Sequence, residues 1–170
     1  MKRAVVIGNS GGGKSTLTRR LSSAWACPGV EIDNLLWQPG WQLTPAEVYT
    51  AEHARLIAGD DWIIDGLGRR DSIPARFDRA TDIILIDMPL WIHFWLAAER
   101  QIEWSRGSIA HPPAGLAGMP STEALFRTIW EVDRDWMPEI RQLATTEEQR
   151  GKRVVRLCSI AELEGFERSL

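Results

Sequence analysis

Lysine, cysteine, tyrosine and asparagine are scarce in this chain of 170 residues. Three lysines stand against 17 arginines, and there are only two cysteines, two asparagines and one tyrosine. The cysteines, Cys27 and Cys158, form neither a CxxC motif nor a metal-ligand spacing, which predicts free thiols in a reducing compartment. We therefore expect a cytoplasmic protein without a disulfide framework.

Long apolar runs and an excess of positive charge are also lacking. The most apolar stretch, 83–98, contains Asp87, Pro89 and His93 and is too polar for a membrane span. The formal net charge of −3 disfavours a nucleic-acid binder, which usually shows a basic stripe. We expect a small-molecule partner, no membrane contact, and a monomer or weak dimer.

The order of hydrophobic patterns predicts a single α/β domain over 1–170. Short apolar runs typical of buried parallel strands occur at 4–7, 30–32, 62–64, 83–86 and 154–157. Helical patterns lie between and after them, at 15–26, 45–58, 89–106, 121–145 and 160–170. This alternation predicts a parallel sheet covered by helices on both faces, with ligands bound outside the carboxyl ends of the strands.

A phosphate-binding loop follows the first predicted strand. It fits the pattern GxxxxGK[ST] and consists of Gly8, Asn9, Ser10, Gly11, Gly12, Gly13, Lys14, Ser15 and Thr16. In such a loop, backbone N–H groups and the N-terminus of the following helix bind phosphate oxygens. Lys14 can reach the β- and γ-phosphates, and the Ser15 hydroxyl can bind Mg²⁺. We expect ATP and Mg²⁺ at this site.

Two motifs that accompany other P-loop functions are lacking. GTP-binding proteins read guanine with Asn-Lys-x-Asp, but neither Asn9 nor Asn34 is followed by lysine. Many hydrolytic P-loop ATPases carry glutamate directly after the strand-end aspartate, whereas glycine follows Asp65 and methionine follows Asp87. These differences favour phosphoryl transfer to a bound acceptor over hydrolysis.

Three acids follow predicted strands at the sheet edge that carries the loop. They are Asp33, Asp65 and Asp87. An aspartate in this place often only caps a helix or forms a turn, and Pro89 favours that interpretation for Asp87. We assign Asp65 to Mg²⁺ and Asp33 to the acceptor hydroxyl or phosphate, as a ligand or as a base.

Three segments resemble the DNA topology modulation protein family, small P-loop proteins related to adenylate and shikimate kinases. They are the phosphate-binding loop, DNLLWQPGW over 33–41 and WIIDG over 62–66. The resemblance covers nearly the whole chain and implies the nucleoside-monophosphate-kinase fold with a five-stranded parallel sheet. It also implies a substrate-binding insertion at about 34–60. An arginine-bearing lid is expected at about 107–121, which is rich in glycine and proline.

Arginines are the preferred phosphate ligands of such a site, because the guanidinium group stays charged and binds two oxygens at once. DGLGR over 65–69 resembles the DGFPR segment of adenylate kinases, which implies that Arg69 grips an acceptor phosphate. The family resemblance places basic residues at Arg100 and Arg134, our preferred clamps. Arg134 could instead belong to a solvated helix face and pair with Glu131.

The tryptophans fall into two groups. Trp91 and Trp95 are spaced as helix neighbours in an apolar segment, which favours packing in the core. Trp37 and Trp41 frame a turn beyond Asp33, where they either form an aromatic wall beside an acceptor or only support the turn.

The leading hypothesis is an ATP- and Mg²⁺-dependent kinase that transfers the γ-phosphoryl group to a nucleoside monophosphate or a hydroxylated metabolite. One alternative, suggested by the family name, is a regulator that binds ATP and acts on DNA topology. The other is an inactive relic that has kept nucleotide affinity.

Overall fold

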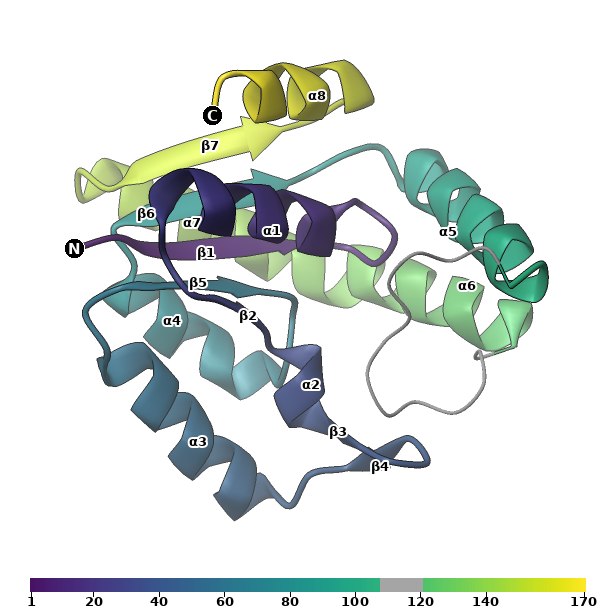
Figure 1. The fold of residues 1–170 in the computed structure, drawn as a ribbon, viewed down its shortest axis with the longest axis horizontal. Coiled ribbons are helices and arrows are strands. Elements are labelled where there is room, and N and C mark those ends of the chain that lie inside the picture. The colour runs from purple at the N-terminus through teal and green to yellow at the C-terminus, as the bar shows by residue number, and fades with distance from the viewer. Residues whose placement is uncertain (108–120) are drawn as a thin grey trace.

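A five-stranded parallel sheet forms the centre of the computed structural model, which describes residues 1–107 and 121–170. The strands are β1 (Arg3–Gly8), β2 (Gly29–Glu31), β5 (Trp62–Asp65), β6 (Asp82–Ile86) and β7 (Arg153–Leu157). They lie side by side in the order β2-β5-β1-β6-β7 (Figure 1). This arrangement confirms the predicted α/β fold and places the carboxyl ends of β1, β2 and β5 at one edge.

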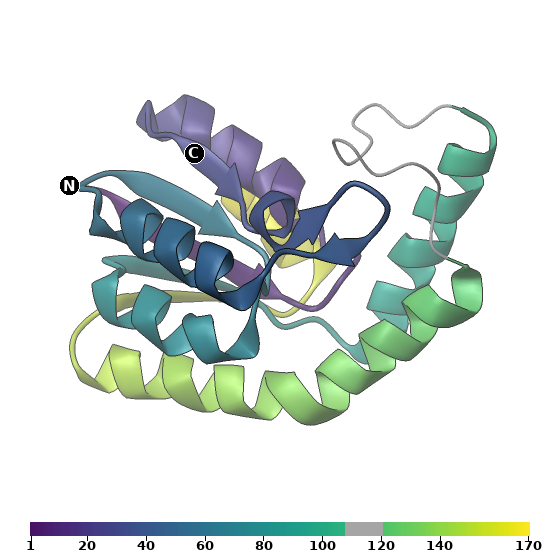
Figure 2. The same ribbon diagram turned by 90° about the horizontal axis from the view of Figure 1, so that it is seen from below.

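Helices cover both faces of the sheet (Figure 2). The longer ones are α1 (Lys14–Trp25), α3 (Ala46–Ala58), α4 (Ile73–Arg79), α5 (Leu90–Ser105), α6 (Thr122–Glu131), α7 (Met137–Gln149) and α8 (Ile160–Arg168). Helices α1 and α8 pack on one face, and α3, α4 and α7 pack on the other. Ser159 precedes the final helix, and its hydroxyl accepts the Glu162 backbone N–H and so caps the helix.

Strand β1 shows why the first apolar run folds as a buried strand. Val5 and Ile7 enter the core beneath α4 and α7, whereas Ala4 and Val6 enter the core beneath α1. All four side chains are fully buried, because alternate residues of a strand point to opposite faces. Because both faces of this strand are covered, every position of the run needs an apolar side chain. An alternation of apolar and polar residues would suit a sheet with one face exposed to solvent.

Short elements fill the segment predicted as an insertion at about 34–60. Helix α2 (Asp33–Leu36) leads into a hairpin of β3 (Trp37–Gln38) and β4 (Gln42–Leu43), which α3 follows. Trp37 and Trp41 contact each other edge to face across the hairpin turn, with ring centroids 5.6 Å apart. Left-handed backbone at Gly40 and Trp41, with φ of 79° and 58°, closes this turn.

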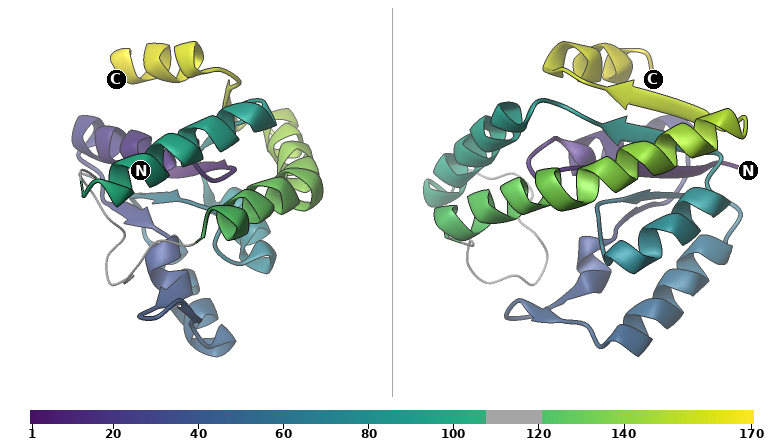
Figure 3. Two further views of the ribbon diagram at one scale, coloured as in Figure 1. Left: turned by 90° about the vertical axis from the view of Figure 1, so that its right-hand side faces the viewer. Right: turned by 180° about the vertical axis from the view of Figure 1, so that it is seen from behind.

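Helices α5 and α6 extend beyond the carboxyl edge of the sheet, and α6 continues toward α7 along one bent path (Figure 3). A π-helical turn, Val132–Trp136, lies between α6 and α7, and Pro138 follows it in the first turn of α7. The predicted lid at about 107–121 lies outside the described residues except at its two ends.

The core assignment of two tryptophans was wrong. Trp91 and Trp95 are 63% and 60% exposed on the outer face of α5, although their spacing suits an inward-facing pair. Helix α5 is apolar on much of its circumference, so the period alone does not say which face is buried. Both cysteines are free thiols as predicted, Cys27 buried and Cys158 exposed. Within 1–107 and 121–170, no helix has the length and apolarity to cross a membrane.

Candidate functional site

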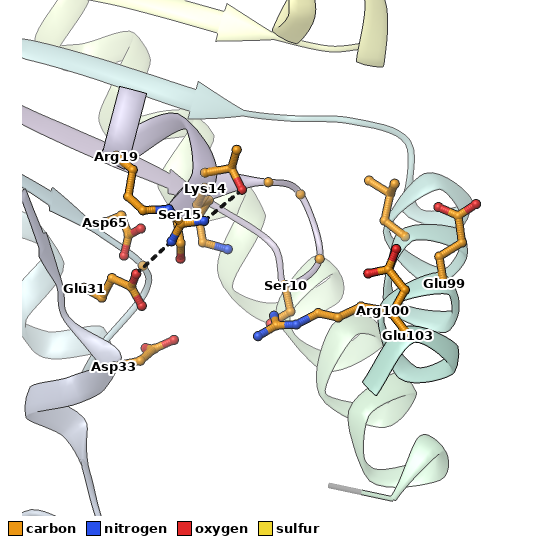
Figure 4. A pocket seen from close by; sticks show the side chains of 16 residues that line it. Ser10, Lys14, Ser15, Arg19, Glu31, Asp33, Asp65, Glu99, Arg100 and Glu103 are labelled. Atoms are coloured by element: carbon orange, nitrogen blue, oxygen red, sulfur yellow. Dashed lines mark hydrogen bonds and ion pairs between the residues drawn. The ribbon is translucent and has the colours of Figure 1, made fainter. Parts of the chain in front are cut away.

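A cavity of about 430 Å³ opens at the carboxyl edge of the sheet, between the phosphate-binding loop, β2, β5 and α5 (Figure 4). Its lining residues are Ser10, Gly11, Gly12, Gly13, Lys14, Ser15, Thr16, Arg19, Glu31, Asp33, Asp65, Gly66, Leu96, Glu99, Arg100 and Glu103. We call it the loop cavity. It brings together most of the residues that the sequence marked as a nucleotide and metal site.

The phosphate-binding loop keeps its shape because it is pressed against β6 and α5. Gly11 and Gly13 have positive φ angles of 80° and 82°, which residues with a side chain rarely adopt. A Cβ atom at Gly12 would lie 3.0 Å from both Ile86 Cγ2 and His93 Cε1. The glycines are therefore needed both for the turn and for close packing, as the motif predicts.

Two side chains fasten the loop to the helices behind it. The Asn9 side chain is buried; its Nδ2 donates to the Ile129 carbonyl at 2.8 Å, and its Oδ1 accepts the Ser10 backbone N–H at 2.8 Å. His93 Nδ1 lies 2.9 Å from the Ser10 carbonyl oxygen, and burial lowers the pKa of His93. His93 therefore has a structural role in this site. These contacts attach the loop to α5 and α6.

Lys14 begins α1 and points into the loop cavity. Its Nζ donates to the Asn9 carbonyl at 2.7 Å. Burial lowers the pKa of Lys14, whereas the charges of Asp33 and Asp65 raise it and that of Arg100 lowers it. The ammonium group therefore lies in the field of both predicted acids, in the place where it can contact phosphate oxygens.

Asp65 ends β5 and is the most deeply buried acid of the cavity. Its Oδ2 has no hydrogen-bond partner among the described residues, and only 3% of the residue is exposed. Burial raises the pKa of Asp65 to about 6; Lys14 and a hydrogen bond from Ser15 oppose this rise, and Glu31 and Asp33 add to it. An unpaired buried carboxylate oxygen next to the Ser15 hydroxyl fits Mg²⁺, which takes one or two protein oxygens together with phosphate oxygens.

Asp33 reaches the same cavity from the first residue of α2. The sequence placed it at a strand end, but β2 stops at Glu31, and Asp33 opens the next helix instead. Gly66 allows this approach: it has φ of 92°, and a Cβ there would lie 3.4 Å from Asp33 Oδ1 and 2.9 Å from Ile32 Cγ2.

Acids outnumber bases around the cavity. Among the lining residues that the structure describes, three are basic, Lys14, Arg19 and Arg100, and five are acidic, Glu31, Asp33, Asp65, Glu99 and Glu103. A triphosphate would meet strong repulsion from such a lining unless a divalent cation accompanied it. The composition of the lining therefore supports the predicted use of Mg²⁺ with the nucleotide.

Sequence reasoning missed several of these lining residues. Glu31 stands two residues before Asp33, and Arg19 lies one helical turn after Ser15, so both positions could have been found from spacing. Arg19 Nη1 pairs with Glu31 Oε1 at 3.3 Å and its Nη2 donates to Thr16 Oγ1 at 3.2 Å, which closes one side of the cavity. Glu99 and Glu103 lie on either side of Arg100 in α5, and no sequence motif marks them as residues of a site.

The two predicted arginine clamps have different positions. Arg100 extends from α5 into the cavity toward Ser10 (Figure 4). Arg134 does not line the loop cavity; its guanidinium binds Asp135 at 2.5 Å and lies 4.4 Å from the centre of the Trp130 ring. The alternative pairing with Glu131 is not what forms, although Arg127 does pair with Glu123 at 2.7 Å. Only Arg100 is positioned as predicted in this conformation.

Arg69 lines a second cavity, of about 680 Å³, beside the first. We call it the hairpin cavity, and its lining residues are Leu36, Leu43, Gly68, Arg69, Arg70, Asp71, Trp136 and Glu139. Arg69 Nη2 pairs with Asp71 Oδ2 at 3.0 Å, and its backbone N–H donates to the Tyr49 hydroxyl at 3.2 Å. Trp37 and Trp41, the candidate aromatic wall, are not among the residues that line either cavity.

A buried arginine supports the turn between the two cavities. Arg76 is fully buried, and its guanidinium donates to the carbonyl oxygens of Gly66, at 3.0 Å, and Leu67. Burial lowers the pKa of Arg76 to about 10, and the group stays charged at neutral pH. Asp87, the third strand-end acid, is instead paired with Arg141 at 2.8 Å, which agrees with a structural role.

Comparisons with known proteins support the fold. No protein-family model matches the chain, and no curated protein matches its sequence. Shikimate kinase from Acinetobacter baumannii in complex with shikimate is similar in structure over 99% of this chain and 90% of that one, with 10% identity and a TM-score of 0.58. Shikimate kinase from Bacteroides thetaiotaomicron is similar over 99% of this chain and 95% of that one, with 12% identity and a TM-score of 0.55.

A gluconokinase from Sinorhizobium meliloti 1021 is similar over 83% of this chain and 97% of that one, with 16% identity and a TM-score of 0.45. The likeness to the two shikimate kinases, with TM-scores above 0.5, shows that the chain has their fold. Because no family model matches, the resemblance to the DNA topology modulation family stays a prediction.

Proposed function

We propose that this chain is an ATP- and Mg²⁺-dependent kinase that transfers the γ-phosphoryl group of ATP to a small acceptor. The observation that carries the proposal is the convergence of Lys14, Ser15, Asp33, Asp65 and Arg100 on one cavity. The fold shared with shikimate kinases supports the same class of reaction.

The roles follow from position. The backbone N–H groups of the loop and Lys14 would bind the phosphates of ATP, as in other P-loop proteins. Ser15 and Asp65 would hold Mg²⁺, which neutralises charge on the β- and γ-phosphates when it is bound. Arg100 would add a positive charge next to the γ-phosphoryl group from the α5 side.

Asp33 is the proposed acceptor-side residue. In the reaction, an acceptor oxygen forms a bond to the γ-phosphorus while the bond from that phosphorus to the β,γ-bridging oxygen breaks, and ADP leaves. When the acceptor is a hydroxyl group, Asp33 takes its proton, which makes the oxygen a better nucleophile. Its place at the start of α2, across the cavity from the phosphate-binding loop, suits this role (Figure 4).

A coupled assay of ADP release tests the proposal. ATP and Mg²⁺ are supplied with nucleoside monophosphates, nucleosides, sugars or hydroxy acids as acceptors, and Lys14→Ala serves as the inactive control. We expect at least one acceptor class to raise ADP release well above the acceptor-free rate. Tight ATP binding without stimulation by any class would contradict the proposal and favour a regulatory or inactive protein.

A further inference from the structure

Helix α5 has an apolar side that faces away from the rest of the protein. Its inner side packs on the molecule through buried residues, namely Ile92, His93, Ala97 and Gln101. On the outer side, Trp91, Trp95 and Ile102 are 63%, 60% and 49% exposed, and Ala98 between them is half-buried. We call these four outer residues the outer seam.

The position of α5 leaves the outer seam accessible. When the molecule is viewed from that side, α5 crosses its front, and no helix or strand of 1–107 and 121–170 lies in front of it (Figure 3, left). Large apolar side chains gathered on one exposed surface are typical of interaction sites. The question is therefore which partner fits this surface.

The outer seam has the spacing of a helix–helix contact. Its members follow one another at intervals of four, three and four residues, from 91 to 95, 98 and 102. This alternation is that of the a and d positions of a coiled coil, which keeps apolar side chains on one side of a helix. The seam extends about 16 Å along α5, at about 1.5 Å per residue. It is long enough to pack against one further helix.

The same spacing is symmetric about its centre, so it fits a second copy of itself. A two-fold axis that sets two α5 helices antiparallel places Trp95 against Ala98 of the other copy, and Trp91 against Ile102 of the other copy. Each contact packs an indole on a smaller apolar side chain, and each occurs twice, as in any two-fold interface. The antiparallel direction also places opposite ends of the two helix dipoles side by side.

The exposed area of the two tryptophans agrees with the size of a small dimer interface. A tryptophan side chain offers up to about 250 Å² of surface, so about 150 Å² of each one is accessible. Two copies together then supply about 600 Å² from tryptophan alone. The smallest stable interfaces bury about 1,200 Å² in total, of which slightly more than half is apolar. The tryptophans therefore supply most of the apolar surface that such a dimer needs.

The charges beside the outer seam favour an identical helix over a lipid surface. Helices that lie on membranes carry a polar side rich in lysine and arginine. The residues that flank the seam, Glu99 and Arg106, have opposite charges, and the seam itself contains no charge. A mixed edge of this kind does not repel a second copy of itself.

We infer that the outer seam is the interface of a two-fold symmetric homodimer, in which the α5 helices of two copies pack antiparallel. The loop cavity stays open in this dimer, because Leu96 and Arg100 reach it from another side of α5. The inference goes beyond the proposed function and does not depend on it.

Sedimentation velocity of the full chain tests the inference. We expect mostly dimer at about 10 μM chain, with a dissociation constant in the low micromolar range. Trp95→Glu should raise this constant at least about a hundred-fold, because it removes a central indole and buries a carboxylate. Val48→Glu is the matched control, since Val48 is exposed on α3, and it should change the constant less than about three-fold. Both variants should keep the far-UV circular dichroism of the wild-type protein.

A double variant tests the antiparallel pairing itself. When Ala98→Arg is added to Trp95→Glu, the arginine of each copy faces the carboxylate of the other, so we expect at least about ten-fold of the lost affinity to return. Association that is no stronger than that of the Trp95→Glu protein would overturn the pairing that we infer.

Three further results would overturn the inference. The first is a wild-type protein that stays monomeric up to about 200 μM chain. The second is a dimer whose dissociation constant does not respond to Trp95→Glu, because the copies then associate through another surface. The third is a monomer that binds phosphatidylcholine vesicles and loses this binding with Trp95→Glu, which would make the outer seam a lipid-binding surface.

Discussion

The loop cavity and the hairpin cavity lie on either side of α2 and the turn at 66–68, and they are built in different ways. The loop cavity depends on buried groups. They are a glycine-rich backbone pressed against β6 and the carboxylate of Asp65, one oxygen of which has no hydrogen-bond partner within 1–107 and 121–170. The hairpin cavity depends on exposed ion pairs that hold its arginines. Buried, fixed groups as in the loop cavity suit the nucleotide, which the phosphate-binding loop recognises by its phosphates. Exposed ion pairs as in the hairpin cavity can rearrange more easily and suit recognition of one particular acceptor.

The comparison predicts the largest loss for a change in the loop cavity. Lys14→Ala removes the only side-chain cation of the phosphate-binding loop, so we expect ATP-dependent transfer to fall about a thousand-fold. ADP release in the presence of an active acceptor measures the change. Lys2→Ala, a lysine outside both cavities, is the control, and equal losses in the two variants would mean that charge at Lys14 is not what matters.

Asp33→Asn tests the acceptor side of the same cavity. Replacing the carboxylate removes a proton acceptor while it keeps the shape, and we expect kcat to fall about a hundred-fold with a hydroxyl acceptor. The affinity for ATP, measured by calorimetry, should change little. Asp60→Asn on the surface is the matched control. An unchanged kcat in the Asp33→Asn protein would remove Asp33 from the mechanism.

Asp65→Asn should change activity and stability in opposite directions. The folded protein holds Asp65 with a pKa of about 6, above the ordinary value of 3.8, so ionisation of this group destabilises the fold as pH rises through that interval. At pH 8 the asparagine variant should therefore unfold at a Tm about 5 °C higher, which corresponds to about 2 kcal/mol, while transfer is lost.

Thermal unfolding of the wild-type and Asp65→Asn proteins at pH 4 and pH 8 checks the direction of this change in Tm. The difference in Tm should shrink at pH 4, because wild-type Asp65 is then largely protonated in the folded state. A lower Tm for the variant at pH 8 would show that the carboxylate stabilises the ligand-free protein. For the same reason, kcat/KM for ATP should decline as pH falls below about 6, where Asp65 is protonated in the free enzyme.

The Arg69→Met substitution tests the role of the hairpin cavity. We expect the KM for an anionic acceptor to rise about ten-fold with little change in the KM for ATP, because the guanidinium faces the acceptor side only. Steady-state kinetics with each substrate varied in turn provides the measurement. Arg55→Met, on the surface of α3, controls for the general loss of a positive charge. An equal rise in both KM values would mean that the two cavities do not act separately.

Arg134→Met should have the smallest effect, because the side chain binds Asp135 and Trp130 outside the loop cavity. We expect kcat/KM to change by less than about three-fold, as for other exposed ion pairs. The same ADP-release assay measures it. A loss of ten-fold or more would show that α6 carries Arg134 to the phosphates during turnover.

The contrast between the cavities also explains what could be predicted from sequence. The strands and the phosphate-binding loop depend on local patterns, so the buried runs and the spacing of Gly8, Gly13 and Lys14 were sufficient. Helix α4 and the hairpin at 37–43 were missed, because such short elements are stabilised by tertiary contacts rather than by propensity. The pair of Arg70 and Glu139 joins residues 69 positions apart, and no local pattern could bring them together.

The positions of single side chains show the same limit. Asp65 was found because a strand end fixes where its side chain lies. The family resemblance made Arg134 a preferred phosphate clamp, but Arg134 lies in the π-helical turn at 132–136 and its guanidinium pairs with Asp135. Trp91 and Trp95 were misplaced because an apolar helix face can be exposed, and only the packed structure shows which face is covered.

Transfer of labelled phosphate tests the central claim most directly. The protein is incubated with Mg²⁺ and ATP labelled at the γ-position, together with a protein-free pool of small metabolites, and the products are separated. The account predicts that the label appears in an anionic organic product made by the wild-type protein and not by the Lys14→Ala variant. Label found only in inorganic phosphate, or remaining in ATP, would contradict it.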